Sequence, residues 1–188
     1  HIVTDGAADM PPDWGEKYQI HTIPINIQFG EESYLQFIDL DFGNFYEKVS
    51  ETNTVPKTAQ PSPHQFVEFY KKIANEGDTI LSIHVTSKLS GTYASAVIAA
   101  EELKDTFNII PVDSAGGSLG IGFMCREARK MEQDGKSLEE ILAYIDGIKS
   151  KVQIILTLDT LEYARMSGRV GTFSAALASA LNIKPIAI

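Results

Sequence analysis

The sequence predicts an α/β fold: a parallel sheet with helices on both faces over residues 1–150, then the beginning of a second, incomplete α/β domain over residues 151–188. Short apolar runs typical of strands alternate with helix-like segments through most of the chain, and this alternation favours a parallel sheet. Helix-start signals mark several of the segments between the runs. Val152 begins a new strand–loop–helix–strand unit, which places the domain boundary near residue 150.

Each predicted strand is a short apolar or alternating run. The predicted strands are residues 1–5, 21–29, 79–85, 107–113, 152–158 and the apolar run at 182–188. Residues 21–29 alternate between apolar and polar side chains, and Pro24 places this strand at an edge because proline cannot donate a ladder hydrogen bond. Residues 30–38 extend it as a hairpin.

The predicted helices follow from caps and apolar stripes. Pro11 and Pro12 open a short helix, and Asp41 caps a helix with apolar residues at helical spacing. Ser62 with Gln65, and Ser137 with the glutamate three residues later, form capping boxes. Further helices are predicted from the Ser-Gly-Thr loop to about residue 103, after a Gly-rich turn to about residue 131, and at 174–181.

Composition narrows the classes of function. The net charge of −9 argues against nucleic acid as a partner, because binding it needs clustered Lys and Arg. The single cysteine, Cys125, excludes a disulfide framework, fits a reducing cytoplasm and is expected to be buried and inert. No apolar run reaches the roughly 18 residues of a membrane span. The chain begins at His1 without methionine and ends in an apolar run, so we expect a trimmed start and an end that is not the natural terminus.

Hydroxyl groups and glycines gather where predicted strands end. Ser90, Gly91 and Thr92 follow one strand, and Ser114 follows the next. In open α/β sheets ligands bind outside the carboxyl ends of the strands, and helix N-termini attract anions. Ser90 either donates to a carboxylate or phosphate oxygen or simply caps the helix.

Known catalytic signatures are missing from the sequence. There is no phosphate loop, no dinucleotide-binding glycine motif, no nucleophile elbow and no metalloprotease helix. The glycines of the GGSLGIG stretch are expected to serve a tight turn and close helix packing. His84, inside a strand, is expected to be structural. Asp5 and Asp113, at strand ends, are ordinary capping residues or, alternatively, the Mg²⁺-binding groups of a small-molecule kinase or phosphohydrolase.

Several segments resemble the DegV family of fatty-acid-binding proteins from residue 2 to the end. The segments are IVTDGAADMP, TAQPSPHQF, HVTSKLSGTYASA, VDSAGGSLGIG and LEYARMSGRVG, in the family's order and at about its spacing. TSKLSGTYASA together with TAQPSP is the specific pair.

The resemblance implies a two-domain bacterial protein that encloses one long-chain fatty acid, with the carboxylate near the domain junction and the acyl tail in an apolar tunnel. It also implies that a separate fatty-acid kinase receives the bound acid, and that the binding protein supplies no catalysis and needs no cofactor or metal. By motif, Ser90 and Thr58 would hydrogen-bond the carboxylate, and Arg169 would lie near the head group or on the surface that meets the kinase.

The chain departs from the family pattern in three places. Ala59 stands where the family usually has serine, and Thr172 where it often has lysine. Family members also continue well past the IKPI segment near the end of this chain. Part of the tunnel wall is therefore expected to be missing from residues 151–188.

Overall fold

The computed structural model describes residues 1–52, 54–157, 166–167 and 186–187. The strands are β1 (Ile2–Asp5), β2 (Ile20–Ile23), β3 (Asn26–Phe29), β4 (Glu32–Leu35), β5 (Lys57–Ala59), β6 (Thr79–His84), β7 (Asn108–Asp113), β8 (Leu156–Thr157) and β9 (Ile186–Ala187). The helices are η1 (Gly6–Ala8, a 3-10 turn), α1 (Trp14–Lys17), α2 (Phe42–Thr52), α3 (Pro63–Ile73), α4 (Thr92–Glu102), α5 (Leu119–Gln133) and α6 (Leu138–Lys149).

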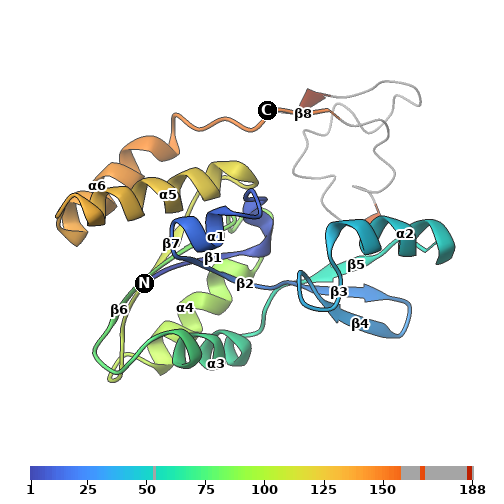
Figure 1. Ribbon diagram of the computed structural model, residues 1–188, viewed down its shortest axis with the longest axis horizontal. Coiled ribbons are helices and arrows are strands. Elements are labelled where there is room, and N and C mark those ends of the chain that lie inside the picture. The colour runs from blue at the N-terminus through green and yellow to red at the C-terminus, as the bar shows by residue number, and fades with distance from the viewer. Residues whose placement is uncertain (53, 158–165, 168–185, 188) are drawn as a thin grey trace.

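A parallel sheet with the strand order β2-β1-β6-β7 forms the centre of the molecule. Helices α5 and α6 cover one face, and α3 and α4 cover the other (Figure 1). The side chains of β6 alternate between the two layers: Leu81 and Ile83 join the α5–α6 core, and Ile80 joins the α3–α4 core. The predicted α/β class and the covered parallel sheet are therefore confirmed.

A second sheet, antiparallel and ordered β4-β3-β5, lies beside the first and packs against α2 (Figure 1). The sequence predicted one strand over residues 21–29, and this was wrong: β2 ends at Ile23, and β3 begins in the other sheet at Asn26. Pro24 lies at this break. The hairpin was right, because β3 and β4 pair antiparallel around Gly30, whose φ of 59° suits glycine.

Both capping boxes are confirmed. The Ser62 hydroxyl accepts from the Gln65 backbone N–H at 3.2 Å, and the Gln65 side chain accepts from the Ser62 N–H at 2.9 Å. Ser137 and Glu140 make the same reciprocal pair at the start of α6. These signals are local, so they depend on little beyond four consecutive residues.

The prediction of a strand over residues 152–158 was too long. Only Leu156–Thr157 is a strand, and it pairs antiparallel with β9. Val152 instead packs against the α5–α6 core, and its Cγ1 lies 2.8 Å from where a Cβ on Gly120 would stand. Close helix packing at this glycine is thus confirmed. The predicted helix at 174–181 lies outside the described residues, and the domain boundary near residue 150 stays a prediction.

Candidate functional site

Three neighbouring parallel strands end in a polar residue at the same edge of the sheet. β1 ends at Asp5, β6 at His84 and β7 at Asp113. Because the strands are parallel, the loops that follow them lie together at their carboxyl ends, where open α/β sheets bind ligands. This edge is the candidate site.

The Ser-Gly-Thr loop leads from this edge into α4. The hydroxyl oxygens of Ser90 and Thr92 lie 2.8 Å apart, and the Thr92 backbone N–H donates to Ser90 Oγ at 3.2 Å. The N-cap residue of α4 is Gly91, which has no side chain to make a cap bond, and Ser90 lies one residue earlier. Ser90 therefore holds the first N–H of the helix but is not the N-cap that the capping interpretation predicts. The Ser90 and Thr92 hydroxyls carry one proton each, and the hydrogen bond between them uses only one of the two. The other hydroxyl proton is left to bond a different acceptor.

The strand that carries Thr58 meets this loop. Thr58 lies in β5, opposite Ile27 of β3, and its side chain is exposed. Two residues on, the Gln60 side chain packs against Gly91: a Cβ on that glycine would stand 2.8 Å from Gln60 Cδ and 2.9 Å from its Oε1. The structure thus brings together two motifs that lie about thirty residues apart, TAQPSP and Ser-Gly-Thr.

A buried chain of hydrogen bonds runs beneath the edge. Tyr70 Oη lies 2.8 Å from Ser82 Oγ, which lies 2.7 Å from His84 Nε2, and His84 Nδ1 lies 3.0 Å from Asp5 Oδ2. Burial raises the pKa of Tyr70, despite its hydrogen bond to Ser82. The spacing resembles a Ser-His-Asp triad, but all four side chains are fully buried, so no substrate reaches Ser82.

Asp5 holds this chain in place. Its carboxylate accepts from His84 Nδ1 and from the backbone N–H groups of Ala7 and Val85, at 2.9 to 3.0 Å. The carboxylate thereby ties the end of β1 to the end of β6. The prediction that His84 is structural is confirmed, and the capping role of Asp5 is favoured over metal binding.

Asp113 joins two loops of the edge. Its carboxylate oxygens accept from the backbone N–H groups of Ser87, at 3.1 Å, and Ala115, at 2.8 Å. Burial alone would raise the pKa of this carboxyl, but hydrogen bonds from Ser87 and Ala115, helped by the charge of Lys149, outweigh it and hold the pKa below 3.8. Both oxygens of Asp113 therefore already accept backbone hydrogen bonds, which favours the capping role for this residue too.

Two of the predicted site residues are not brought to the Ser-Gly-Thr loop by any described contact. Ser114 is buried, and its hydroxyl bonds within its own turn, donating to the Gly116 carbonyl at 3.1 Å and accepting from the Gly116 N–H at 3.2 Å. Arg169 lies outside the described residues. Gln60 was not singled out from the sequence, since only the folded chain shows its contact with Gly91.

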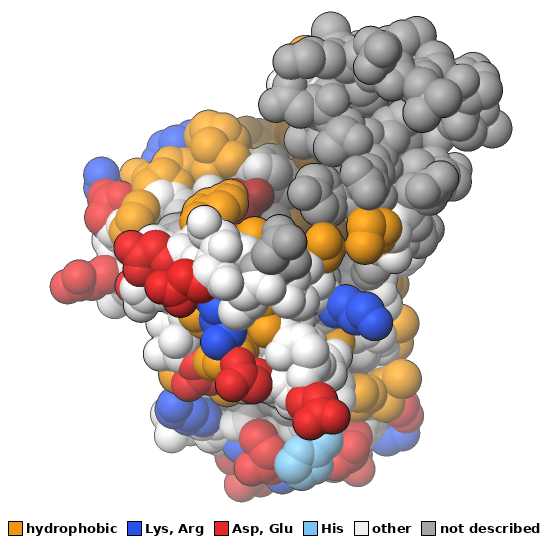
Figure 2. Space-filling model, turned by 90° about the vertical axis from the view of Figure 1, so that its right-hand side faces the viewer, with side chains coloured by type: hydrophobic (Ala, Val, Ile, Leu, Met, Phe, Trp, Pro, Cys, Tyr) orange, Lys and Arg blue, Asp and Glu red, His pale blue; other side chains and the backbone are white. Residues whose placement is uncertain are grey.

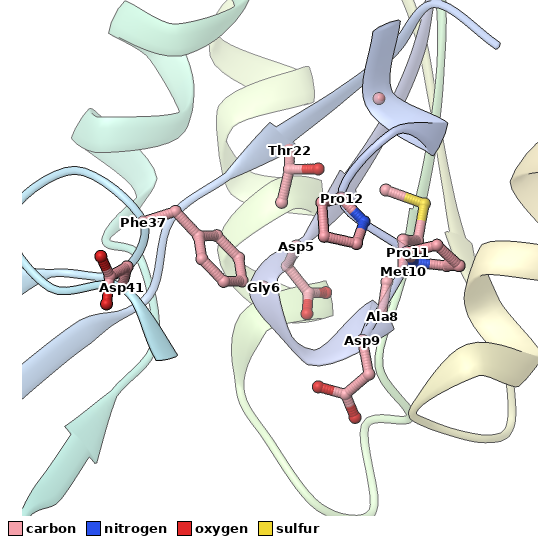
Figure 3. Close-up of a pocket in the computed structure, with 11 residues that line it drawn as sticks. Asp5, Gly6, Ala8, Asp9, Met10, Pro11, Pro12, Thr22, Phe37 and Asp41 are labelled. Atoms are coloured by element: carbon pink, nitrogen blue, oxygen red, sulfur yellow. The ribbon is translucent and has the colours of Figure 1, made fainter. Parts of the chain in front are cut away.

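A cavity of about 400 Å³ opens where β1 and β2 end. In Figure 3, Phe37 faces Met10, Pro11 and Pro12 across the cavity, with the Asp5 carboxylate between them. The cavity is walled largely by apolar groups, but Asp5, Asp9 and Asp41 also line it. The exposed carboxylates of Asp9 and Asp41 would repel an anionic head group, so the hydroxyl loop is the better anion site.

Two other kinds of site, a metal centre and a basic surface for nucleic acid, find no support in the described residues. No group of three or more His, Cys, Asp or Glu side chains among them is placed to hold a metal ion. On the face shown in Figure 2, acidic and basic side chains are interspersed, without a broad basic surface. No helix in the described part of the chain is long and apolar enough to cross a membrane.

Comparison with known sequences gives a consistent match. A family model described as "Uncharacterised protein, DegV family" matches residues 1–187. The protein DegV of Bacillus subtilis (strain 168) is 35% identical over 186 residues, which cover 98% of this chain and 66% of that protein. A DegV domain-containing protein of Clostridium perfringens is 36% identical over 187 residues, covering 97% and 65%. The chain therefore spans about two thirds of the length of these curated relatives.

Solved structures give the same result. The crystal structure of DegV from Bacillus subtilis, described as a fatty acid binding protein, is similar with a TM-score of 0.89 and 34% identity, covering 98% of this chain and 66% of that one. A protein of Thermus thermophilus, whose structure is described as showing fatty acid binding, has a TM-score of 0.85 and 32% identity, covering 98% and 65%. A Thermotoga maritima protein described as revealing fatty acid binding function has a TM-score of 0.78 and 32% identity, covering 89% and 62%.

Proposed function

The chain belongs to the DegV family, and from this and the site geometry we propose that it binds a long-chain fatty acid with the carboxylate at the Ser-Gly-Thr loop. One observation carries the assignment of the head-group site: the contact of Gln60 with Gly91, which brings the TAQPSP strand against that loop. Without this contact the two motifs would be separate features of the sequence.

The loop suits a carboxylate for physical reasons. Burying a carboxylate is costly unless hydrogen bonds replace its water, and a net-negative protein must supply those bonds locally. Ser90 and Thr92 keep one hydroxyl proton free, and both residues stand at the positive end of α4, an eleven-residue helix. These donors reconcile a charge of −9 with an anionic ligand.

Thr58 supplies a further donor from the opposite side. In an extended segment, residues two apart point to the same side, so Thr58 and Gln60 share an orientation. The Gln60 side chain reaches Gly91, and Thr58 is therefore expected to face the same loop. Its exposure in the described residues leaves the hydroxyl accessible to a ligand.

The acyl tail provides most of the affinity. Burying each methylene is favourable by about 0.8 kcal/mol, so an apolar tunnel outweighs the cost of desolvating one head group. A Cβ built on Gly116 or on Gly117 would lie 3.7 Å from Ile154 Cδ1. The loop after β7 therefore makes an apolar contact with the segment that follows α6. We place the tunnel beyond this contact, between the proposed domain of residues 1–150 and the unit that begins at 151.

Delivery of the bound acid completes the proposal. The protein would present the carboxylate to a separate fatty-acid kinase, in the cytoplasm, for acyl phosphate formation, with Arg169 near the head group or on the docking surface. Asp5 and Asp113 are engaged by backbone N–H groups of their own turns and of the segment at the end of β6, which supports a binding role for this chain rather than catalysis by these carboxylates.

The test is the lipid content of the purified protein. Denaturation, solvent extraction and mass spectrometry should recover close to one long-chain fatty acid per wild-type molecule. The Ser90→Ala and Thr58→Ala variants each remove a hydrogen bond to a charged group, worth about 1.5–3 kcal/mol, so each should weaken binding roughly 10- to 150-fold.

Thr79→Ala is the matched control, because Thr79 is an exposed threonine at the opposite end of β6 from the site. It should retain the lipid of the wild type. A double variant of Ser90 and Thr58 that still carries one fatty acid per molecule would refute the head-group site. A wild type that carries and binds none would refute the proposed function itself.

A further inference from the structure

We infer that the side-chain amide of Gln60 is a further hydrogen-bond donor to the fatty-acid carboxylate, and that residue 91 is glycine so that this amide has room. The inference rests on the proposed function. It adds Gln60 to the head-group site, and the observation behind it is the close approach of the Gln60 amide to Gly91.

The amide fills the space that a side chain at position 91 would need. A Cβ built on Gly91 would stand 2.8 Å from Gln60 Cδ and 2.9 Å from Oε1, and closer still to Nε2. The nitrogen of the amide is therefore the group nearest to the loop. This nitrogen donor lies against Gly91, the residue between Ser90 and Thr92, whose hydroxyls are the other donors of the loop.

The backbone conformation does not explain this glycine. Gly91 has φ −78° and ψ 4°, values that other residues adopt as well. A glycine at such a position is entropically unfavourable relative to alanine, by roughly 0.4–1 kcal/mol. Space for the Gln60 amide is the reason that the structure offers for glycine here.

The backbone of Gln60 is held so that its side chain points across to the loop. Asn26 Nδ2 donates to the Gln60 carbonyl at 3.3 Å, and the Asn26 and Gln65 amides donate to each other at 3.3 and 3.1 Å. Gln65 is in turn fixed by the capping box of α3. Pro61 favours an extended conformation at the preceding residue. The backbone of Gln60, one residue past the end of β5, is thus held in place, and only its side-chain torsions remain free.

The amide has donors to spare. Within the described residues, the Gln60 side chain makes no hydrogen bond, although an amide carries two N–H donors. A carboxylate offers about four lone-pair sites, and the hydroxyls of Ser90 and Thr58 use only part of them. A neutral donor at this point also discriminates: it favours an anionic head group without the desolvation cost of burying a lysine.

A double-mutant cycle tests the inference. The affinity of delipidated protein for oleate is measured by displacement of a fluorescent fatty acid, and stability by urea unfolding. Gln60→Ala should weaken binding about tenfold, and Gly91→Ala should weaken it similarly by displacing the amide. The double variant should bind no worse than Gln60→Ala, because no amide remains to be displaced.

Stability separates this role from a structural one. The Gln60 side chain is flexible and exposed, so it can swing away from an alanine at 91, and Gly91→Ala should leave the midpoint of unfolding unchanged or slightly raised. Gln60→Glu should weaken binding at least tenfold more than Gln60→Ala, since it sets one carboxylate against another. Gln28→Glu, on the exposed part of β3, and Gly147→Ala, where a Cβ meets open space, are the controls.

The outcomes divide clearly. A wild type that binds oleate, with Gln60→Ala at wild-type affinity or with additive losses in the cycle, overturns this inference and leaves the proposed function standing. Equal affinities for Gln60→Glu and Gln60→Ala do the same. A wild type that binds neither the fluorescent acid nor oleate overturns the proposed function, and the inference falls with it.

Discussion

Replacing Asp5 by asparagine is the sharpest test of the buried network, because the two side chains have the same shape. Asp5 uses both oxygens: Oδ1 accepts from the Ala7 N–H, and Oδ2 accepts from the Val85 N–H and His84 Nδ1. Asparagine has one oxygen and one NH₂ group. In either orientation of the amide, at least one backbone N–H faces another donor.

The loss of stability follows from the number of backbone N–H groups that lose their acceptor. A buried donor left without an acceptor costs about 1–3 kcal/mol, and bonds to a charged acceptor are stronger than those to a neutral one. Asp5 is fully buried, so water does not replace the lost acceptor. We expect the free energy of unfolding to fall by about 2–4 kcal/mol, which lowers Tm by roughly 4–16 °C in a protein of this size.

Urea unfolding followed by circular dichroism at pH 7 measures the change. Asp9→Asn is the matched control, since Asp9 is exposed on the same turn and has φ 45°, a conformation that asparagine also tolerates. The control should lie within about 0.5 kcal/mol of the wild type. If Asp5→Asn were equally mild, the carboxylate would not be the group that joins β1 to β6.

The remaining predictions concern two groups whose pKa is shifted. Asp113→Asn should lower the free energy of unfolding by about 1 kcal/mol at pH 7, because one of the two loop N–H groups loses its acceptor. The folded-state pKa of Asp113 lies below 3.8, so its contribution to the free energy of unfolding is present above that pH and is lost as the pH falls through the lower folded value. The free energies of unfolding of the wild type and Asp113→Asn should therefore converge in acid. A constant difference between them down to about pH 2.5 would contradict the assignment. Burial raises the pKa of the Cys125 thiol to about 12, so a thiol reagent at pH 8 should label the native protein at least a hundredfold more slowly than the unfolded one, and equal labelling rates would contradict the burial.

Local patterns in the sequence predicted most of the parallel-sheet region. The capping boxes at Ser62 and Ser137 depend on residues three apart, and both formed as predicted. The prediction that Cys125 is buried was also right, because its apolar neighbours share one helix face of α5. Such features need little information from the rest of the chain.

Features that depend on distant segments were missed or wrong. The strand predicted over 21–29 divides between two sheets, and no local pattern shows where a chain leaves one sheet for another. β5 has only exposed residues, so it lacks the apolar run by which strands are recognised, and it was not predicted. The role of Gln60 has no local signal at all, since it depends on a glycine 31 positions further along the chain.

The central claim is that hydroxyl and amide donors from the Ser-Gly-Thr loop and from the TAQPSP segment facing it hold an ionised carboxylate. ¹³C NMR of carboxyl-labelled palmitate bound to the delipidated protein tests this most directly, because the carboxyl shift reports ionisation. The bound acid should stay ionised to a lower pH than the free acid, and the Ser90→Ala and Thr58→Ala substitutions, each made singly and measured with saturating palmitate, should reduce that difference. A bound carboxyl that titrates like the free acid, or one that is indifferent to these substitutions, would contradict the claim.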